Sequence, residues 1–191
     1  MGEMDKTYND KNLAEEKVSS KEIFKGVLLH VFQDTVKLPN GNETLREYIT
    51  HNGAVCIIPI TDDGKVIMER QFRYPVRKVI SEIPAGKLES KEEDPLEAAK
   101  RELMEETGYT ADTWIDMGWY MGAPAYTDEG VKMFMAKGLK KGDRHLDDDE
   151  FLNVYTESLD TLFDLVMKGE IKDGKTIVAV LKAKYMLDNE K

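Results

Sequence analysis

Cysteine is nearly absent from this sequence, since Cys56 is the only one among 191 residues. A single cysteine excludes a disulfide within the chain and favours a reducing compartment. Its neighbours Val55 and Ile57 are apolar, so we expect a buried structural thiol rather than a nucleophile. The chain also lacks the ~18 consecutive apolar residues of a membrane span and the apolar core of a signal peptide. Together these absences predict a cytoplasmic protein with no membrane partner.

Positive charge is in short supply. The chain has 27 Lys and Arg residues against 37 Asp and Glu, which gives a net charge of −10. This balance argues against nucleic acid or an anionic membrane as the partner. An anionic substrate would therefore require metal ions or arginine side chains at its binding site to offset the negative charge. The length suits one domain with a substantial core and a small appendage.

A short helix with marked ends is predicted between Asp94 and Gly108. Asp94 can cap it, Pro95 fits its first position, and Gly108 supplies the stop. At 100° per residue one side of this helix is suited to burial. That side comprises Leu96, Ala99, Leu103 and Thr107.

Another side of this helix carries Glu102, Glu105 and Glu106. Like charges one turn apart cost roughly 0.2–0.5 kcal/mol, and the helix dipole disfavours anions in the last turn. The cluster is favourable if divalent cations neutralise it, since Mg²⁺ binds carboxylate oxygens, water and phosphate. Arg101 is placed to pair with one carboxylate and fix its rotamer. For the Glu-Glu pair alone, a solvated acidic face is the alternative.

The ordered string around this helix resembles the Nudix box, a loop–helix–loop metal site. Seven residues separate Glu93 from Arg101, as in the box, whereas six rather than five separate Gly86 from Glu93. An extra residue in this polar loop costs little, because loop-closure entropy grows slowly with length. The matching positions are Arg101, Glu102, Leu103, Glu105, Glu106, Gly108 and Tyr109. The resemblance implies an α/β fold, a Nudix-type α/β/α sandwich with a mixed central sheet.

Periodicity and turn signals are consistent with that fold. Residues 1–20 are expected to form a loose or partly helical arm, followed by a β-hairpin that turns at residues 39–42. Further strands are predicted at 53–60, 65–73, 78–83, 114–120, 131–136 and 151–156, and helices at 159–168 and 175–187. We therefore expect a small N-terminal extension, residues 1–50, and a catalytic domain, residues 51–191. The extension is the predicted dimerisation and substrate-lid element.

Three further stretches resemble the ADP-ribose pyrophosphatase branch of the family. They are residues 70–75 (RQFRYP), 81–86 (SEIPAG) and 123–129 (APAYTDE), which includes Pro124. The branch usually carries Ser-Pro-Gly-Phe in the last stretch, so Ala123, Ala125 and Tyr126 depart from it. The resemblance implies Mg²⁺-dependent hydrolysis of ADP-ribose to AMP and ribose 5-phosphate by a homodimer with exchanged N-terminal elements. The alternatives are another sugar nucleotide, such as GDP-mannose, and a non-catalytic ADP-ribose-binding regulator.

The resemblance also assigns site residues. Arg46 and Arg73 have guanidinium forks that match phosphate, with a surface ion pair as the alternative for each. Residues 147–152 are similar to the acidic loop that carries the branch's water-activating carboxylate, and they leave Asp148, Glu150 and Glu105 as candidate bases. The predicted catalytic residues are Arg101, Glu102, Glu105, Glu106, Asp148 and Glu150. The predicted substrate-binding residues are Arg46, Arg73, Glu82 and Pro124. The predicted ligands of Mg²⁺, or alternatively Mn²⁺, are the Ala85 carbonyl, Glu102, Glu105, Glu106 and Glu150.

Overall fold

The computed structural model describes residues 10–146 and 151–189. These residues form two compact units. The first contains the described residues up to His51, together with Ala123–Asp128. The second contains Asn52–Gly122 and the described residues from Glu129 onward.

The first unit is built on a three-stranded antiparallel sheet in the order β1 (Glu16–Lys25), β2 (His30–Lys37) and β3 (Glu43–Thr50). The predicted turn between β2 and β3 is confirmed, since the Leu38 amide donates to the Asn42 carbonyl at 2.8 Å. The prediction of a loose or helical arm is wrong for residues 16–20, which open β1. All ten residues of β1 are exposed, so the strand has no buried apolar side that the sequence could reveal. Only backbone pairing with β2 defines it.

The segment Ala123–Asp128 joins this unit through β3. The Ile49 amide donates to the Tyr126 carbonyl at 2.8 Å, and the His51 amide donates to Asp128 Oδ1 at 2.6 Å. The loop that carries Pro124 is therefore bonded to the end of β3, far away in the sequence.

The second unit contains two sheets with the orders β7-β4-β9-β8 and β10-β5-β6. Pairing of β4 with β9 is parallel and the other pairings are antiparallel, so the predicted mixed sheet is confirmed. The strands are β4 (Ala54–Pro59), β5 (Lys65–Arg73), β6 (Lys78–Glu82), β7 (Ala85–Lys87), β8 (Tyr109–Met121), β9 (Gly130–Lys141) and β10 (Leu152–Ser158).

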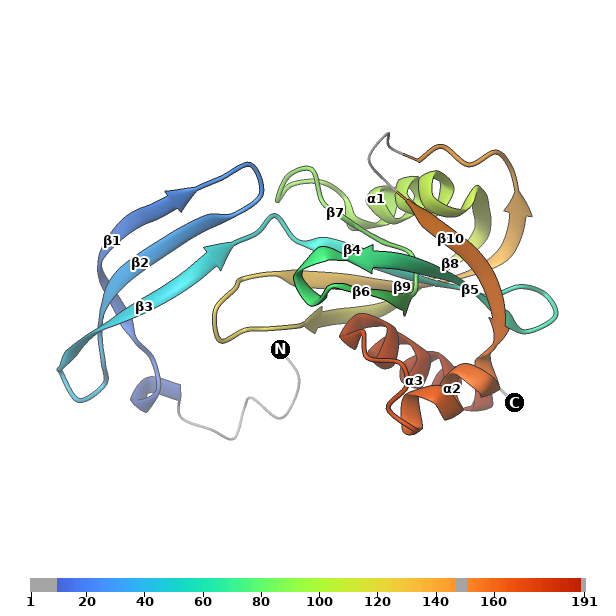
Figure 1. The fold of residues 1–191 in the computed structure, drawn as a ribbon. Helices are drawn as coiled ribbons and strands as arrows, with labels where there is room; N and C mark the ends of the chain where they lie inside the picture. Colours follow the sequence, from blue (N-terminus) through green and yellow to red (C-terminus); the bar gives the residue numbers. More distant parts are fainter. Residues whose placement is uncertain (1–9, 147–150, 190–191) are drawn as a thin grey trace. The chain divides into compact units, whose positions relative to one another are not determined.

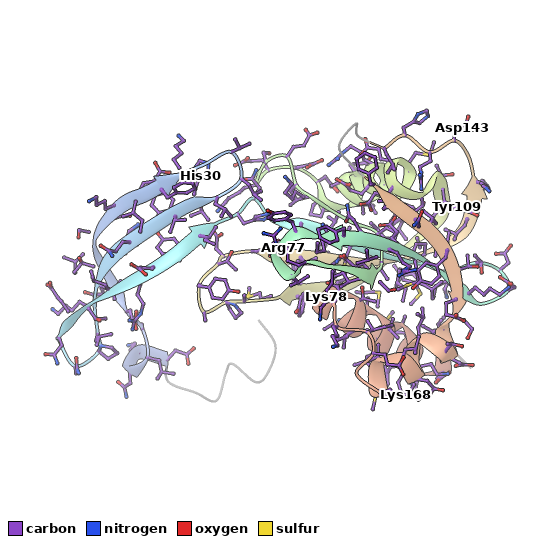
Figure 2. All side chains as sticks on the ribbon, viewed as in Figure 1. His30, Arg77, Lys78, Tyr109, Asp143 and Lys168 are labelled. Atoms are coloured by element: carbon purple, nitrogen blue, oxygen red, sulfur yellow. The ribbon has the colours of Figure 1, made fainter. Side chains whose placement is uncertain are left out.

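Strands β8 and β9 are longer than predicted. Their antiparallel pairing runs from Tyr109 opposite Lys141 to Met121 opposite Gly130. Backbone hydrogen bonds continue the ladder beyond the apolar runs that mark the strands in the sequence. Figure 2 labels Tyr109 at the start of β8.

Helices cover both faces of the sheet formed by β7, β4, β9 and β8, with α1 (Pro95–Glu102) on one side and α2 (Leu159–Met167) and α3 (Gly174–Asn189) on the other (Figure 1). Alternate residues of β4 point to opposite faces of the sheet, and so pack against the helices on the two sides. Val55 and Ile57 pack in a cluster with Ala99 of α1, whereas Cys56 and Ile58 pack in a cluster with α3. This arrangement confirms the α/β/α sandwich.

Cys56 is fully buried, as the sequence predicts, and burial raises its thiol pKa to about 12. A thiol with this pKa stays protonated at neutral pH and is a poor nucleophile. Among the described residues, no helix is long and apolar enough to cross a membrane.

Candidate active site

The predicted box helix forms with the predicted ends. Asp94 Oδ1 accepts hydrogen bonds from the amides of Leu96 at 2.7 Å and Glu97 at 3.3 Å, and α1 begins at the next residue. After α1 the backbone widens into a π-helical turn, Leu103–Thr107, which stops at Gly108 with a φ of 75°. Such turns are frequent at functional sites. The predicted apolar side is confirmed: Ala99, Leu103 and Thr107 are buried, and Leu96 is partly buried against the same cluster.

Glu106 turns inward from this π-helical turn. Its side chain is only 4% exposed, and its Oε2 accepts a hydrogen bond from the Ala85 amide at 3.0 Å. Ala85 is also paired with Cys56 of β4 through the short strand β7. The Ala85 peptide is therefore held between the central sheet and a buried carboxylate.

Glu102 reaches the same place from α1. A Cβ built on Gly86 would lie 1.9 Å from the Glu102 carboxyl carbon. Only a residue without a side chain allows this carboxylate to rest against the backbone beside Ala85. The Gly that opens the box is thus explained by a contact with a residue sixteen positions later.

Arg101 links the carboxylates of the loop and the helix. Its Nη1 donates to Glu102 at 2.8 Å and its Nη2 donates to Glu93 at 3.2 Å, while Glu105 lies 3.5 Å away. Glu93 also accepts the amide of Glu89 at 2.6 Å within the loop, so the bond from Arg101 to Glu93 ties this loop to the helix. The extra loop residue therefore leaves the box contacts in place. Partial burial lowers the pKa of Arg101, but the carboxylates of Glu102, Glu93 and Glu105 outweigh it and raise that pKa.

For the hydrolysis that the box resemblance implies, replacing Arg101 by Lys is expected to lower kcat/KM about tenfold to a hundredfold, the range for groups that orient metal ligands. A single ammonium cannot bridge Glu93 and Glu102 with the fixed fork of a guanidinium. Steady-state kinetics at saturating Mg²⁺ measure the loss. Lys100→Arg is the matched control, because Lys100 pairs with Glu97 on the exposed side of α1. Equal activities of the two variants would contradict a role for Arg101 in orienting Glu102.

The donors gathered here fit a hard divalent cation. Glu102 and Glu106 supply carboxylate oxygens around the Ala85–Gly86 backbone, and the absent Cβ of Gly86 leaves the space that Glu102 occupies. Within residues 10–146 and 151–189, no group of three or more His, Cys, Asp or Glu side chains could hold a metal. A cation held by Glu102 and Glu106 would take its remaining ligands from backbone oxygen, further carboxylates, water or phosphate, all of which Mg²⁺ accepts. Glu105 is 43% exposed and faces Arg101, and Asp148 and Glu150 lie outside the described residues.

A second cluster of charges surrounds Glu82, whose side chain is 3% exposed. Arg73 donates to it through Nε at 2.7 Å and Nη2 at 2.9 Å, and Lys175 Nζ donates to Glu82 Oε2. The sequence analysis missed Lys175 and its second partner Asp173, which lies 3.0 Å away. An Asp three residues before Thr176, at the start of a predicted helix, is a capping signal that marks this segment.

Acidification is expected to remove a stabilising contribution of Glu82. Burial raises the pKa of Glu82, but hydrogen bonds and charge from Arg73 and Lys175 outweigh burial and lower that pKa below its usual value. A carboxylate with a lowered folded pKa stabilises the fold above the unfolded value of about 4.3, and this contribution is lost as pH falls through the folded pKa. The Tm difference between wild type and Glu82→Gln should therefore be large at neutral pH and shrink below about pH 4. Thermal melts across this range test it, with Glu97→Gln on exposed Glu97 as control.

Arg46 and Pro124 belong to the first unit. Arg46 forms a forked pair with Glu15, with Nε–Oε2 at 3.0 Å and Nη2–Oε1 at 2.6 Å. Both candidate phosphate-binding arginines therefore contact glutamates in this structure, Arg46 on β3 and Arg73 at Glu82, three residues before Ala85.

Comparisons with known proteins identify related sequences and a related fold. A family profile described as the NUDIX domain matches residues 50–181. The chain is 41% identical over 185 residues to an ADP-ribose pyrophosphatase of Bacillus subtilis (strain 168), covering 95% of this chain and 100% of that protein. It is 42% identical over 171 residues to a methanol dehydrogenase activator of Bacillus methanolicus, covering 88% and 92%. A solved structure described as an ADP compounds hydrolase aligns with a TM-score of 0.83 at 22% identity, over 92% of this chain and 95% of that chain, which shows a shared fold.

Proposed function

Because this chain belongs to the Nudix family, we propose that it hydrolyses the pyrophosphate bond of ADP-ribose, giving AMP and ribose 5-phosphate. The observation that carries the proposal is the meeting of Glu102 and Glu106 at the Ala85–Gly86 backbone. The similarity to the Bacillus subtilis ADP-ribose pyrophosphatase, which extends over nearly the whole chain, supports the choice of substrate.

The proposed cofactor is Mg²⁺, with Mn²⁺ as the alternative. The Ala85 carbonyl, Glu102 and Glu106 would hold it, with Glu105 and Glu150 as further ligands. A divalent cation supplies charge stabilisation at phosphorus and acidifies a bound water. Arg101 keeps Glu102 in position, and Glu106 fixes the Ala85 peptide whose carbonyl is needed.

The proton of the attacking water goes to a carboxylate, for which Asp148, Glu150 and Glu105 are the candidates.

Arg73 binds the diphosphate with the exposed part of its guanidinium, since its side chain is 42% exposed while Glu82 orients it. Arg46 and Pro124 are the proposed substrate contacts of the first unit.

The N-terminal extension, residues 1–50, is proposed to form a homodimer and to cover the substrate of the catalytic domain, residues 51–191. Strand β1 is an edge of its sheet and is exposed along its whole length, which is a template for pairing with another chain. Exposed Val18, Ile23 and Phe24 on this strand add apolar surface.

The buried lone cysteine suits the reducing cytoplasm, where we place the reaction.

Product analysis tests the proposed reaction. The protein is incubated with ADP-ribose and Mg²⁺, with and without a chelator, and products are identified by ³¹P NMR. AMP and ribose 5-phosphate in equal amounts, lost with chelator, are expected. GDP-mannose is tested in parallel, and a higher kcat/KM for it would identify the protein as a pyrophosphatase for another sugar nucleotide. ADP-ribose binding without turnover would identify a regulator.

The similarity to a methanol dehydrogenase activator favours one second candidate, the activation of a dehydrogenase. Wild type and Glu106→Gln are added to a methanol dehydrogenase, and its rate is measured. Activation by wild type would support this function, and its loss in the variant would show that it depends on hydrolysis.

A further inference from the structure

The first turn of α3 contacts the segment that leads into the metal site. Thr176, which is fully buried, accepts the Ile83 amide at 3.0 Å through Oγ1 and donates the same hydroxyl to Asp173 Oδ2 at 2.6 Å. Asp173 also accepts the Thr176 amide at 3.0 Å, so the hydroxyl is held in one orientation. A side chain from the C-terminal helix thus binds a backbone group two residues before Ala85.

Lys175 contacts the residue before Ile83. Its Nζ donates to Glu82 and lies 3.0 Å from Asp173, and its side chain is only 14% exposed. Glu82 in turn holds the Nε and Nη2 edge of Arg73 at 2.7 and 2.9 Å. The direction of the Arg73 guanidinium therefore depends on a carboxylate that Lys175 helps to fix.

The same segment is bound from two other sides. The Ile57 amide of β4 donates to the Pro84 carbonyl at 2.9 Å, and the Ala85 amide donates to Glu106 at 3.0 Å. Between Glu82 and Ala85 every residue thus has a hydrogen bond to another element, and two of these bonds come from α3.

We propose that Lys175 and Thr176 are positioning residues of the active site. Thr176 sets the path of the backbone to Ala85, and Lys175 sets the direction of Arg73 through Glu82. The inference rests on the proposed function, in which the Ala85 carbonyl holds the cation and Arg73 holds the diphosphate. The two residues are expected to act on different quantities, metal affinity for Thr176 and substrate KM for Lys175.

Thr176→Val and Thr176→Ser form the first test pair. Valine keeps the shape but removes the hydroxyl, so the Ile83 amide loses its partner and the segment moves, whereas serine keeps the bond. We expect Thr176→Val to weaken Mn²⁺ binding, measured by EPR titration without substrate, about tenfold. Exchange of the Ile83 amide, followed by NMR, should accelerate in the same variant. Thr176→Ser should stay within about threefold of wild type in both measurements.

Lys175→Met and Lys184→Met form the second pair. Lys184 lies on the same helix and pairs with Asp160 and Asp188, so it controls for loss of an ion pair on α3. We expect Lys175→Met to raise the KM for ADP-ribose about tenfold with kcat changed less than threefold, and Lys184→Met to change neither. Should Lys175→Met not fold, Lys175→Gln, which removes the positive charge but keeps a polar side chain beside Glu82 and Asp173, replaces it in the KM comparison.

The proposal is overturned if Thr176→Val lowers the melting temperature but binds Mn²⁺ as wild type does, since Thr176 is then only structural. A KM of Lys175→Met equal to that of Lys184→Met overturns the part assigned to Lys175. If the wild type does not cleave ADP-ribose, the proposed function fails, whereas Mn²⁺ affinity and Ile83 exchange still decide the role of Thr176.

Discussion

Glu106→Gln is expected to lower kcat/KM for ADP-ribose hydrolysis about 10³-fold, the upper end of the range for loss of one group that stabilises a transition state. Glu106 is 4% exposed and contacts the Ala85 peptide, so its charge acts in a site that excludes most water. Glutamine removes the negative charge that a divalent cation needs. Steady-state kinetics across Mg²⁺ concentrations measure the loss.

The fold should survive this substitution. The amide oxygen of glutamine can accept the Ala85 hydrogen bond that Glu106 Oε2 accepts now. A thermal melt is expected to place the variant within a few degrees of wild type, because one buried hydrogen bond and the packing volume are retained. Activity within threefold of wild type would remove Glu106 from the mechanism.

Glu105→Gln is the matched control for Glu106→Gln. Glu105 adjoins Glu106 in the chain but is 43% exposed and faces Arg101. We expect a loss of about tenfold or less, because an exposed carboxylate contributes less to a bound cation than a buried one. A loss as large as that of Glu106→Gln would show that Glu105 is as essential as Glu106, either as a principal metal ligand or as the base.

Gly86→Ala is expected to lower kcat/KM about 10²-fold with little change in stability. The new methyl group would lie 1.9 Å from the Glu102 carboxyl carbon, so the carboxylate must move away. It can do so, since it is the end of a flexible side chain and Gly86 does not have the left-handed backbone that alanine avoids. The substitution therefore displaces a proposed metal ligand without disrupting the core.

Gly122→Ala is the control, because its Cβ would meet Tyr120 at 3.6 Å, an ordinary contact. Mn²⁺ affinity, kcat/KM and Tm are measured for both variants. Unchanged metal affinity in Gly86→Ala would show that metal binding does not require the Glu102 carboxylate to lie beside Gly86. A large fall in Tm would show that the close contact is structural rather than functional.

Local sequence features were sufficient to predict the box helix and most strands and helices of the second unit. Asp94, Pro95 and Gly108 mark the helix ends chemically, and the apolar side follows from helical periodicity. The continuous apolar run of β4 likewise predicts a buried strand. These features depend on residues close together in the chain, so they can be read from the sequence.

The sequence could not show contacts that depend on distant segments. Strand β1 forms because β2 pairs with it, although all of its residues are exposed and most of them are polar. Lys175 meets Glu82 across 93 positions, and no local pattern marks that pair.

The sequence by itself determined that Glu102 and Glu106 lie about one helical turn apart, since their spacing is a property of one helical segment. The tertiary structure decided what those carboxylates contact. Folding brings the helix against Ala85 and Gly86, and it places α3 behind the same loop. The physical reason is that side-chain spacing within a helix is set by its own backbone, whereas the position of a loop is set by every element that packs on it.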